Sequence, residues 1–462
     1  MGYDERQAAL RMAELVTENR QLREQLSTAE KELEALRSAN RHLQERLAEL
    51  ERASARQAAP FRRREKQKVP ASQRKKPGRK PGHPGAYRQI PDHIDQEVEV
   101  PLPCCPHCHG KVFDRTPLVQ FIEEIPPIRP LVTRLVTWQA NCPACGEVRT
   151  THPLQTSTAG GAAAVQLGPR ALSIAALLNK QLGVTMGKTC RTLRKLLGLR
   201  ITRGGLSQAL DRMAGKVESD YDALVHTIRT SDAVYSDETS WWVGAPGWWL
   251  WIFATPAATL YRVEASRASQ VVHETLGGDF AGMLVSDCLN IYDTIDCRKH
   301  KCIAHHLRAI AKARERPDTE DASYLQQWKR LFQAVTALWK ARPRMSEEAF
   351  VQERARIEQT VERLLRQPVT QPGDVAVQNR LLKQGPHLLG CLHEPAAEPT
   401  NNRAERALRP AVIARKVSCG NRTERGRRTW EILASLAATC DLNADDFLDW
   451  LAPRLSLAMP VG

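Results

Sequence analysis

The chain is 462 residues long, carries a formal net charge of +15 and contains twelve cysteines. This length allows two or three domains with hydrophobic cores. We find no apolar run of membrane-spanning length, and the charged, helix-like N-terminus does not resemble a signal peptide, so we expect a cytoplasmic protein without a membrane partner. In that setting, cysteines are expected to be reduced thiols or metal ligands and not disulfides.

The positive charge is concentrated in two segments. Residues 61–90 hold eleven Lys or Arg and one acid, and residues 401–430 hold nine Lys or Arg and two acids. The rest of the chain is close to neutral. Two basic patches on a near-neutral body are typical of polyanion contacts, which predicts a nucleic-acid partner.

Residues 1–52 have the heptad pattern of a leucine zipper. One position of the repeat is occupied by Met12, Asn19, Leu26, Leu33, Asn40 and Leu47, and the other by Leu15, Leu22, Ala29, Leu36, Leu43 and Leu50. Buried asparagines such as Asn19 and Asn40 favour parallel, in-register dimers. We therefore predict a coiled coil that forms a homodimer or a higher oligomer. The alternative is a long amphipathic helix packed on its own chain.

Residues 53–95 lose this periodicity and form a basic linker rich in Pro and Gly. Its Gly-Arg segment resembles extended peptides that lie in the DNA minor groove, and nonspecific phosphate contact is the alternative. The residues that we expect to bind DNA here are Arg74, Lys75, Lys76, Arg79 and Lys80.

Residues 96–155 contain two Cys-x-x-Cys pairs, separated by 33 residues. Four thiolates from two such pairs suit the tetrahedral coordination of one structural Zn²⁺, and a redox pair is the alternative. The predicted zinc ligands are Cys105, Cys108, Cys142 and Cys145.

Residues 165–220 have helical patterns interrupted by glycine-containing turns. Short helices of this kind with exposed basic residues are compatible with a helix-turn-helix that binds DNA, here through Arg191, Arg194 and Lys195. A small helical bundle that joins two domains is the alternative.

Residues 230–293 change to α/β character. Segments 233–243, 248–255 and 259–265 are predicted strands, 269–276 a helix and 282–287 a fourth strand. This order is that of a ribonuclease H-like core, in which the first and fourth strands are neighbours. Asp237 lies within the first strand and Asp287 ends the fourth, so we expect both carboxylates in one site. An edge-strand aspartate that faces water is the alternative for Asp237.

Residues 294–399 are predicted to form a helical insertion in this core. Cys302 and the histidines at 305 and 306 have metal-like spacing, but no second pair follows, which favours a buried cysteine beside polar histidines.

Residues 400–462 are the predicted C-terminal helical part of the core. Glu405 is the third candidate acid, although it could instead close a capping box with Asn402. We expect Pro410 to end or kink this helix. The basic residues around Glu405, which are suited to binding DNA, are Arg403, Arg406, Arg409, Arg415 and Lys416.

Taken along nearly its whole length, the sequence resembles bacterial transposases of the insertion-sequence-66 type. The resemblance rests on the leucine-rich N-terminus, the segment 82–85 (Gly-His-Pro-Gly), the paired cysteine motifs, the segments 237–239, 286–287 and 292–293, Cys302 with His305, and the Asn-Asn to Arg-Pro block at 401–410. The sequence departs from the family pattern after Asp287, where we expect a Gly-aromatic pair, and at the doubled histidine.

The resemblance implies a DDE active site formed by Asp237, Asp287 and Glu405. Such a site holds two Mg²⁺ or Mn²⁺ ions, cleaves element ends and joins them to target double-stranded DNA. Accessory proteins encoded by the same element would be further partners. A zinc-containing dimeric DNA-binding regulator without catalysis and a ribonuclease H-like nuclease without strand transfer are the alternatives.

Overall fold

The computed structural model describes residues 3–56, 82–85, 87–159, 164–316, 319 and 321–457, without side chains for 3–10, 13–14 and 45–56. The predicted DNA contacts at Arg74, Lys75, Lys76, Arg79 and Lys80 lie outside these residues. The chain divides into two units, residues 1–83 and 84–462. None of the described helices is long and apolar enough to cross a membrane.

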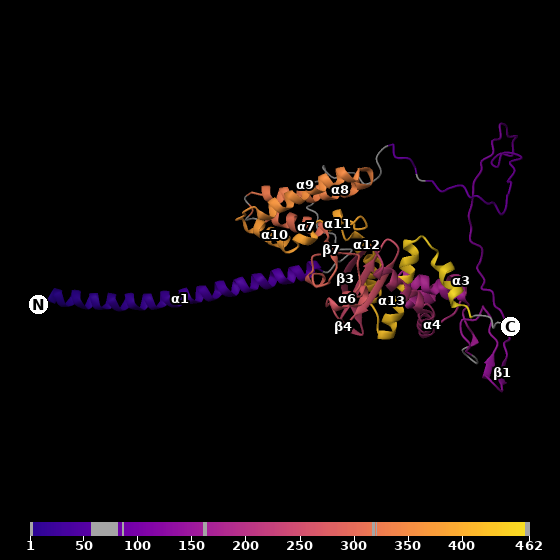
Figure 1. Ribbon diagram of the computed structural model, residues 1–462, viewed down its shortest axis with the longest axis horizontal. Coiled ribbons are helices and arrows are strands. Elements are labelled where there is room, and N and C mark those ends of the chain that lie inside the picture. The colour runs from indigo at the N-terminus through magenta and orange to yellow at the C-terminus, as the bar shows by residue number, and fades with distance from the viewer. Residues whose placement is uncertain are drawn as a thin grey trace. The chain divides into compact units, whose positions relative to one another are not determined.

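The first unit contains one continuous helix, α1 (Tyr3–Arg56), which covers the predicted leucine zipper (Figure 1). The leucines between residues 15 and 43, whose side chains are described, face solvent in the single chain, and Leu26 and Leu36 are 60% and 68% exposed. A helix with an unburied apolar seam fits the coiled-coil prediction, and the oligomer itself stays a prediction.

The second unit begins with a largely exposed segment that carries a small hairpin of β1 (Gln139–Cys142) and β2 (Gly146–Arg149). Four α-helices follow: α2 (Pro169–Ala176), α3 (Met186–Leu197), α4 (Arg203–Lys216) and α5 (Glu218–Arg229), with a π-helical turn at Leu177–Gln181 after α2. Thr185 and Thr202 cap α3 and α4 with their side chains. Gly198 ends α3 in the left-handed conformation that glycine adopts readily.

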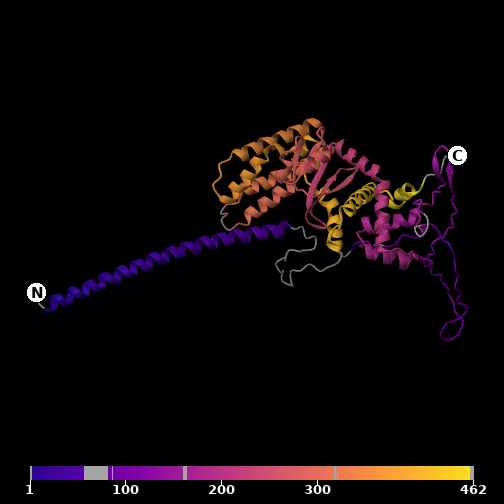
Figure 2. The ribbon, with the colours of Figure 1, turned by 90° about the horizontal axis from the view of Figure 1, so that it is seen from below.

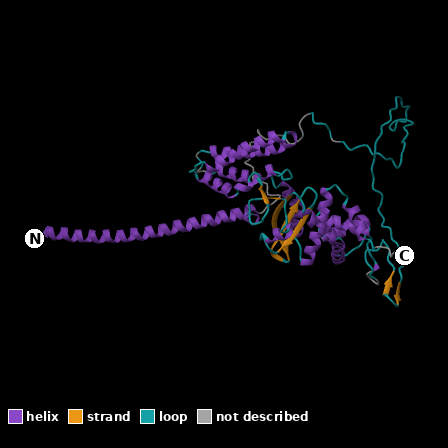
Figure 3. Cartoon of the chain, in the orientation of Figure 1, coloured by secondary structure: helices purple, strands orange, loops and turns teal. Residues whose placement is uncertain are grey.

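A five-stranded mixed sheet forms the centre of this unit, in the order β5-β4-β3-β6-β7 (Figure 3). The strands are β3 (Ala233–Val243), β4 (Ala245–Ala254), β5 (Thr259–Glu264), β6 (Met283–Ser286) and β7 (Arg298–Lys301). Strands β3, β4 and β5 form an antiparallel meander, whereas β6 runs parallel to both β3 and β7. The predicted contact between the first and fourth strands is therefore confirmed, and the α/β character of this region with it.

The two faces of the sheet are covered by different helices. Because side chains alternate along a strand, neighbouring residues of β3 enter different cores. Ala233 and Tyr235 enter a core shared with the helices of the insertion. Val234 enters a second core with α2, α4, α5 and α13 (Glu424–Leu442). The helix α6 (Gln270–Leu276) belongs to the second core. Figure 2 shows the insertion helices as an orange group on one side of the strands and the magenta and yellow helices on the other. The central strand β3 is thus buried on both faces.

The insertion consists of α7 (Ile303–Arg314), α8 (Ser323–Ala341), α9 (Glu347–Arg366), α10 (Pro372–Lys383) and α11 (Gly390–His393). Short 3-10 turns lie at 290–292, 342–344 and 385–387. The prediction that residues 294–399 are helical is wrong for 298–301, which form the fifth strand β7.

Three helices complete the unit: α12 (Asn402–Ser418), α13 (Glu424–Leu442) and α14 (Phe447–Leu455). Helix α12 packs on β3 and β4, and α13 packs along β5. Pro410 does not end α12, which continues for two more turns to Ser418. Of the two outcomes predicted at this proline, the helix end is wrong, and the kink stays a prediction.

Candidate active site

Asp237 lies on the central strand β3, just beyond its pairing with β6. The parallel pairing runs from Ala233 to Tyr235 on β3, and β6 ends at Ser286. Asp237 shares the strand face of Tyr235, which is the face that α12 covers. Beyond Tyr235, β3 therefore has no pairing with β6, and the half-buried Asp237 lies at this point.

Asp287 is the first residue after β6 and reaches the same edge of the sheet. Carboxyl ends of neighbouring parallel strands meet at one edge, which is where α/β proteins place their ligands. Its side chain accepts a 2.8 Å hydrogen bond from the backbone N–H of Leu289, which fixes the turn that follows the strand.

Glu405 lies in the first turn of α12. No side-chain cap is formed at this helix end, so the capping box considered for Asn402 and Glu405 is not present. The Glu405 carboxylate instead lies 3.5 Å from Nη2 of Arg308 on α7, and its side chain is 37% exposed. It is thus available to a ligand from solvent.

A chain of hydrogen bonds joins the three segments that carry these acids. Asn401 donates from its side chain to the backbone oxygen of Ser236 at 2.8 Å, and its backbone N–H points to Sγ of Cys302 at 3.2 Å. The backbone N–H of Cys302 in turn donates to the oxygen of Ser286 at 2.9 Å. We call these contacts the Cys302–Asn401 link. Ser236 and Ser286 directly precede the two aspartates, so the link fixes all three acidic segments to one another.

The charges of the cluster act on Asp237. Burial raises the pKa of Asp237 well above its ordinary value, and the carboxylates of Glu238, Asp287 and Glu405 raise it further. A hydrogen bond from the backbone N–H of Glu238 opposes this only in part. The site concentrates negative charge that a bound cation would stabilise.

Glu238 is a fourth acid of this region that sequence reasoning did not assign. It lies on the other face of β3, where its buried carboxylate accepts hydrogen bonds from Arg267 and from the Tyr292 hydroxyl, both at 2.7 Å. Burial nevertheless raises the pKa of Glu238. With its oxygens already occupied, Glu238 fixes the strand and the turn at Tyr292.

Lys301 and His305 also lie close to the site. The fully buried Lys301, at the end of β7, forms a 2.9 Å ion pair with Asp293 and lies 3.3 Å from the Ser286 hydroxyl. His305 lies 2.7 Å from Arg308. Burial lowers the pKa of His305, and Arg308 lowers it further, while the charges of Asp287 and Glu405 oppose the change. In the sequence, Lys301 ends a segment of strand length, residues 298–301, that follows Asp293 and Asp296. This pattern could have drawn attention to it.

A divalent cation fits the chemistry of Asp237, Asp287 and Glu405. Carboxylate oxygens are the ligands that Mg²⁺ prefers, and a bound cation would oppose the effect of burial and of the neighbouring carboxylates, which raise the pKa of Asp237. Among the described residues, however, no group of three or more His, Cys, Asp or Glu side chains lies in an arrangement that could hold a metal directly. Metal binding therefore requires the three side chains to draw closer together.

The four predicted zinc ligands likewise form no metal-binding group among the described residues. Cys105 and Cys142 each begin a tight turn, and hydrogen bonds from the backbone of Cys108 and of Cys145 lower the pKa of their thiols. The chemistry of each pair fits thiolate coordination. The described structure does not bring the two pairs into one metal-binding group, so the zinc site stays a prediction.

The predicted DNA-binding residues of α12 fall into two groups. Arg403 forms a 2.6 Å ion pair with Glu398, and Arg415 donates to Thr239 and Ser240, so both hold the fold together. Arg406, Arg409 and Lys416 are exposed. On α3, Arg191, Arg194 and Lys195 are exposed as well.

The molecule is thus an α/β protein with an acidic cluster at the carboxyl edge of a mixed sheet. Residues 164–429 match the family described as Transposase IS66 family, so this chain belongs to the IS66 transposase family. It is also similar to the uncharacterized protein y4qI of Sinorhizobium fredii (strain NBRC 101917 / NGR234), with 26% identity over 290 residues. That match covers 56% of this chain and 54% of the relative, so the chain spans about half of that relative's length.

Proposed function

We propose that the protein is a DDE transposase that binds the ends of an insertion sequence and catalyses metal-dependent strand cleavage and strand transfer. The family membership supports a transposase role. The observation that carries the catalytic assignment is the Cys302–Asn401 link, which ties together three sequence-distant segments, each bearing one acid. A ribonuclease H-like core is the fold that this arrangement of strands supports best.

Asp237 would be shared by two Mg²⁺ or Mn²⁺ ions, with Asp287 and Glu405 each holding one. Bound in this way, the ions supply an activated water and neutralise the leaving oxygen of the phosphodiester. The protein contributes the desolvated environment of Asp237, in which electrostatic interactions at the reacting phosphate would be stronger than in water. We expect Arg308, which lies 3.5 Å from Glu405, to contact the same phosphate.

The remaining parts would hold DNA and a second copy of the protein. Arg406, Arg409 and Lys416 project from α12 as exposed cations suited to DNA phosphates, as are Arg191, Arg194 and Lys195 on α3. The exposed leucines of α1 would pair with a second chain, which suits a reaction that brings two element ends together. The cysteine pairs would form a domain stabilised by one structural zinc ion.

The test compares single substitutions in an assay with end-sequence DNA and Mg²⁺. We expect Asp237→Asn, Asp287→Asn and Glu405→Gln each to lower cleavage and joining at least about 10³-fold, because each removes one charged ligand, while end binding stays within about twofold. Matched controls are Asp222→Asn on α5 and Glu348→Gln in the first turn of α9, both exposed acids away from the cluster.

Three outcomes separate the alternatives. Cleavage that persists in one of the three variants removes that residue from the site. Cleavage without joined products by the unsubstituted protein supports a nuclease that lacks strand transfer. DNA binding with no metal-dependent cleavage supports the zinc-containing regulator and contradicts the proposal.

A further inference from the structure

A basic hollow lies between α3 and the start of α4, away from the acidic cluster. It has a volume of about 590 Å³ and is lined by Gly187, Cys190, Arg191, Arg194, Arg200, Ile201, Thr202 and Arg203. This volume is typical of sites that hold whole ligands. The hollow includes Arg200 and Arg203, which the sequence did not single out.

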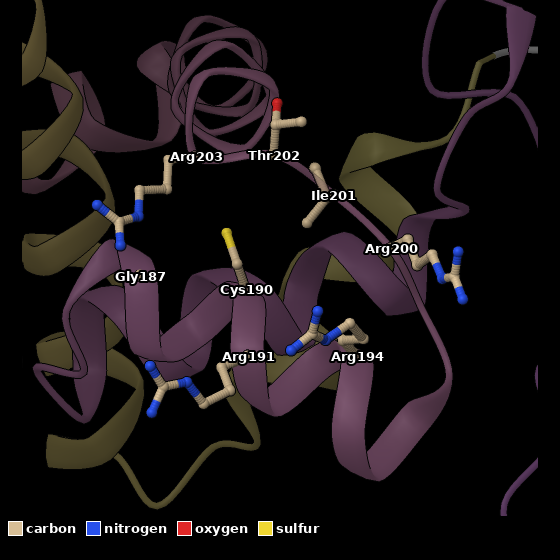
Figure 4. A pocket seen from close by; sticks show the side chains of 8 residues that line it. All are labelled: Gly187, Cys190, Arg191, Arg194, Arg200, Ile201, Thr202 and Arg203. Carbon is tan, nitrogen blue, oxygen red and sulfur yellow. The ribbon is translucent and has the colours of Figure 1, made fainter.

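The two walls of the hollow come from separate pieces of backbone. Residues 187, 190, 191 and 194 have the spacing that places side chains on one face of a helix, so α3 forms one wall. The connection to α4 and its first residue form the other (Figure 4). The figure shows the Cys190 sulfur pointing into the space between these walls, with Arg203 on one side and Arg200 directed outward on the other.

Positive charge in this hollow is not neutralised by the protein. Four arginines line it and no acid does, and all four are exposed. Within the described part of the chain, we find no ion pair between any of the four and an acidic side chain. The N-terminus of α4, which has no acid in its first turn, adds the positive end of a helix dipole. The ligand that complements this surface is a polyanion.

Close approach of a ligand backbone is possible on both walls. A Cβ atom on Gly187 would lie 3.0 Å from Nη2 of Arg203, so the absence of a side chain leaves room for that guanidinium over α3. A Cβ atom on Gly204, in the first turn of α4, would meet nothing within 4 Å. Of the first three residues of α4, Gly204 and Gly205 have no side chain that could pair with a base edge, and the guanidinium of Arg203 lies over Gly187 on α3.

We propose that the basic hollow binds the phosphate backbone of double-stranded DNA and acts as a clamp that does not read sequence. The inference rests on the proposed function in taking DNA as the polyanion, and it adds where and how the helical domain holds it. In a helix-turn-helix, residues at the start of the second helix contact bases in the major groove. Here the same position presents an arginine and two glycines, which suits phosphate contact.

The first test measures DNA affinity of the full-length protein as a function of salt, with Mg²⁺ and Mn²⁺ omitted so that no cleavage occurs. We expect Arg191→Gln/Arg194→Gln, and separately Arg200→Gln/Arg203→Gln, to reduce the slope of log K against log salt by about 1.8, since each lost phosphate contact contributes about 0.9. The reduction should be equal on end-sequence DNA and on a shuffled duplex. The matched control is Arg363→Gln/Arg366→Gln, two exposed arginines on α9, which should leave the slope unchanged.

An unchanged slope in both hollow variants would overturn the clamp. A loss confined to end-sequence DNA would also overturn it, because that result requires base reading. Circular dichroism of each variant verifies that the helices are retained.

The second test reports on the hollow itself through Cys190. Alkylation of this thiol, followed by peptide mass analysis, should slow several-fold when either duplex is bound, and the protection should be lost in Arg191→Gln/Arg194→Gln. Equal reactivity with and without DNA would contradict the inference. Neither test involves Mg²⁺, so the clamp and the proposed function can fail separately. If both tests give the expected results but the protein does not cleave DNA, only the proposed function is refuted. If the protein cleaves DNA but the two tests fail, only the clamp is refuted.

Discussion

Replacing Asn401 by alanine tests whether the Cys302–Asn401 link positions the acids. The Asn401 side chain is fully buried and donates a 2.8 Å hydrogen bond to the backbone oxygen of Ser236, next to Asp237. Alanine removes this donor and keeps the backbone N–H that contacts Cys302. The substitution therefore cuts one specific bond between α12 and β3.

The structure sets the magnitude of the effect. An unpaired buried carbonyl costs about 1–3 kcal/mol. The Asn401 Oδ1 atom is itself buried without a hydrogen-bond partner, so losing it offsets part of this cost. We expect a destabilisation of about 1–2 kcal/mol. A shift of about 1 Å in the relative position of Asp237 and Glu405 would lower cleavage by about 100-fold.

The assays are denaturant unfolding for stability and single-turnover cleavage with saturating DNA for activity. Asn402→Ala is the matched control, because Asn402 is the exposed next residue and makes no side-chain cap. The reasoning is refuted if Asn401→Ala loses the expected stability yet cleaves as fast as Asn402→Ala. A loss of cleavage explained by lower DNA affinity would refute it as well.

Two further predictions concern ionisation and metal binding. Burial raises the pKa of Asp237, so folding favours its protonated form; this stabilisation is complete below the unfolded value of 3.8 and is lost as the pH rises through the folded pKa. In EDTA at neutral pH, Asp237→Asn should therefore melt above the unsubstituted protein, by roughly 2–4 °C for each kcal/mol gained, and an equal or lower melting temperature would contradict the raised pKa. Cys142→Ser should reduce bound zinc, measured by elemental analysis, from about one ion per chain to nearly none. Substitution of the exposed Cys419 by serine should leave the zinc content unchanged. Equal zinc content in the two variants would exclude the predicted site.

Local patterns were sufficient to predict most of the sheet. The segment 233–243 is strand β3 to the residue, and β4, β5, α6 and β6 begin within three residues of their predicted positions. Alternating apolar residues and a glycine turn at Gly244 carry this information within a few residues of sequence. Strand β7 was missed because its sequence, Arg-Lys-His-Lys, is uniformly polar. The ion pair of Lys301 with Asp293 offsets the cost of burying the lysine charge, and that contact is tertiary.

The candidate site, like the sheet, could be predicted only in part from local sequence. Asp237 and Asp287 could be placed together from strand order, whereas Glu405 was assigned by resemblance to a family. The Cys302–Asn401 link joins residues 99 positions apart, and Asn401 reaches Ser236 across 165 positions. No periodicity encodes such a pairing, so the contacts that orient the acids were not predictable from local sequence.

The helical insertion helps to explain how Glu405 can reach the other two acids. The segment between α11 and α12 is fixed to the sheet: the Tyr235 hydroxyl donates to the oxygen of Ala396 at 3.1 Å and accepts from the backbone N–H of Glu398 at 2.7 Å. Trp339 of α8 donates to the oxygen of Ala397 at 2.8 Å. Tyr235 lies on the same strand and the same face as Asp237, so the insertion and the strand hold the chain on the way to α12 together. The insertion therefore acts together with the Cys302–Asn401 link in directing the third acid to the sheet edge, because Tyr235 and Trp339 hold the segment that leads into α12.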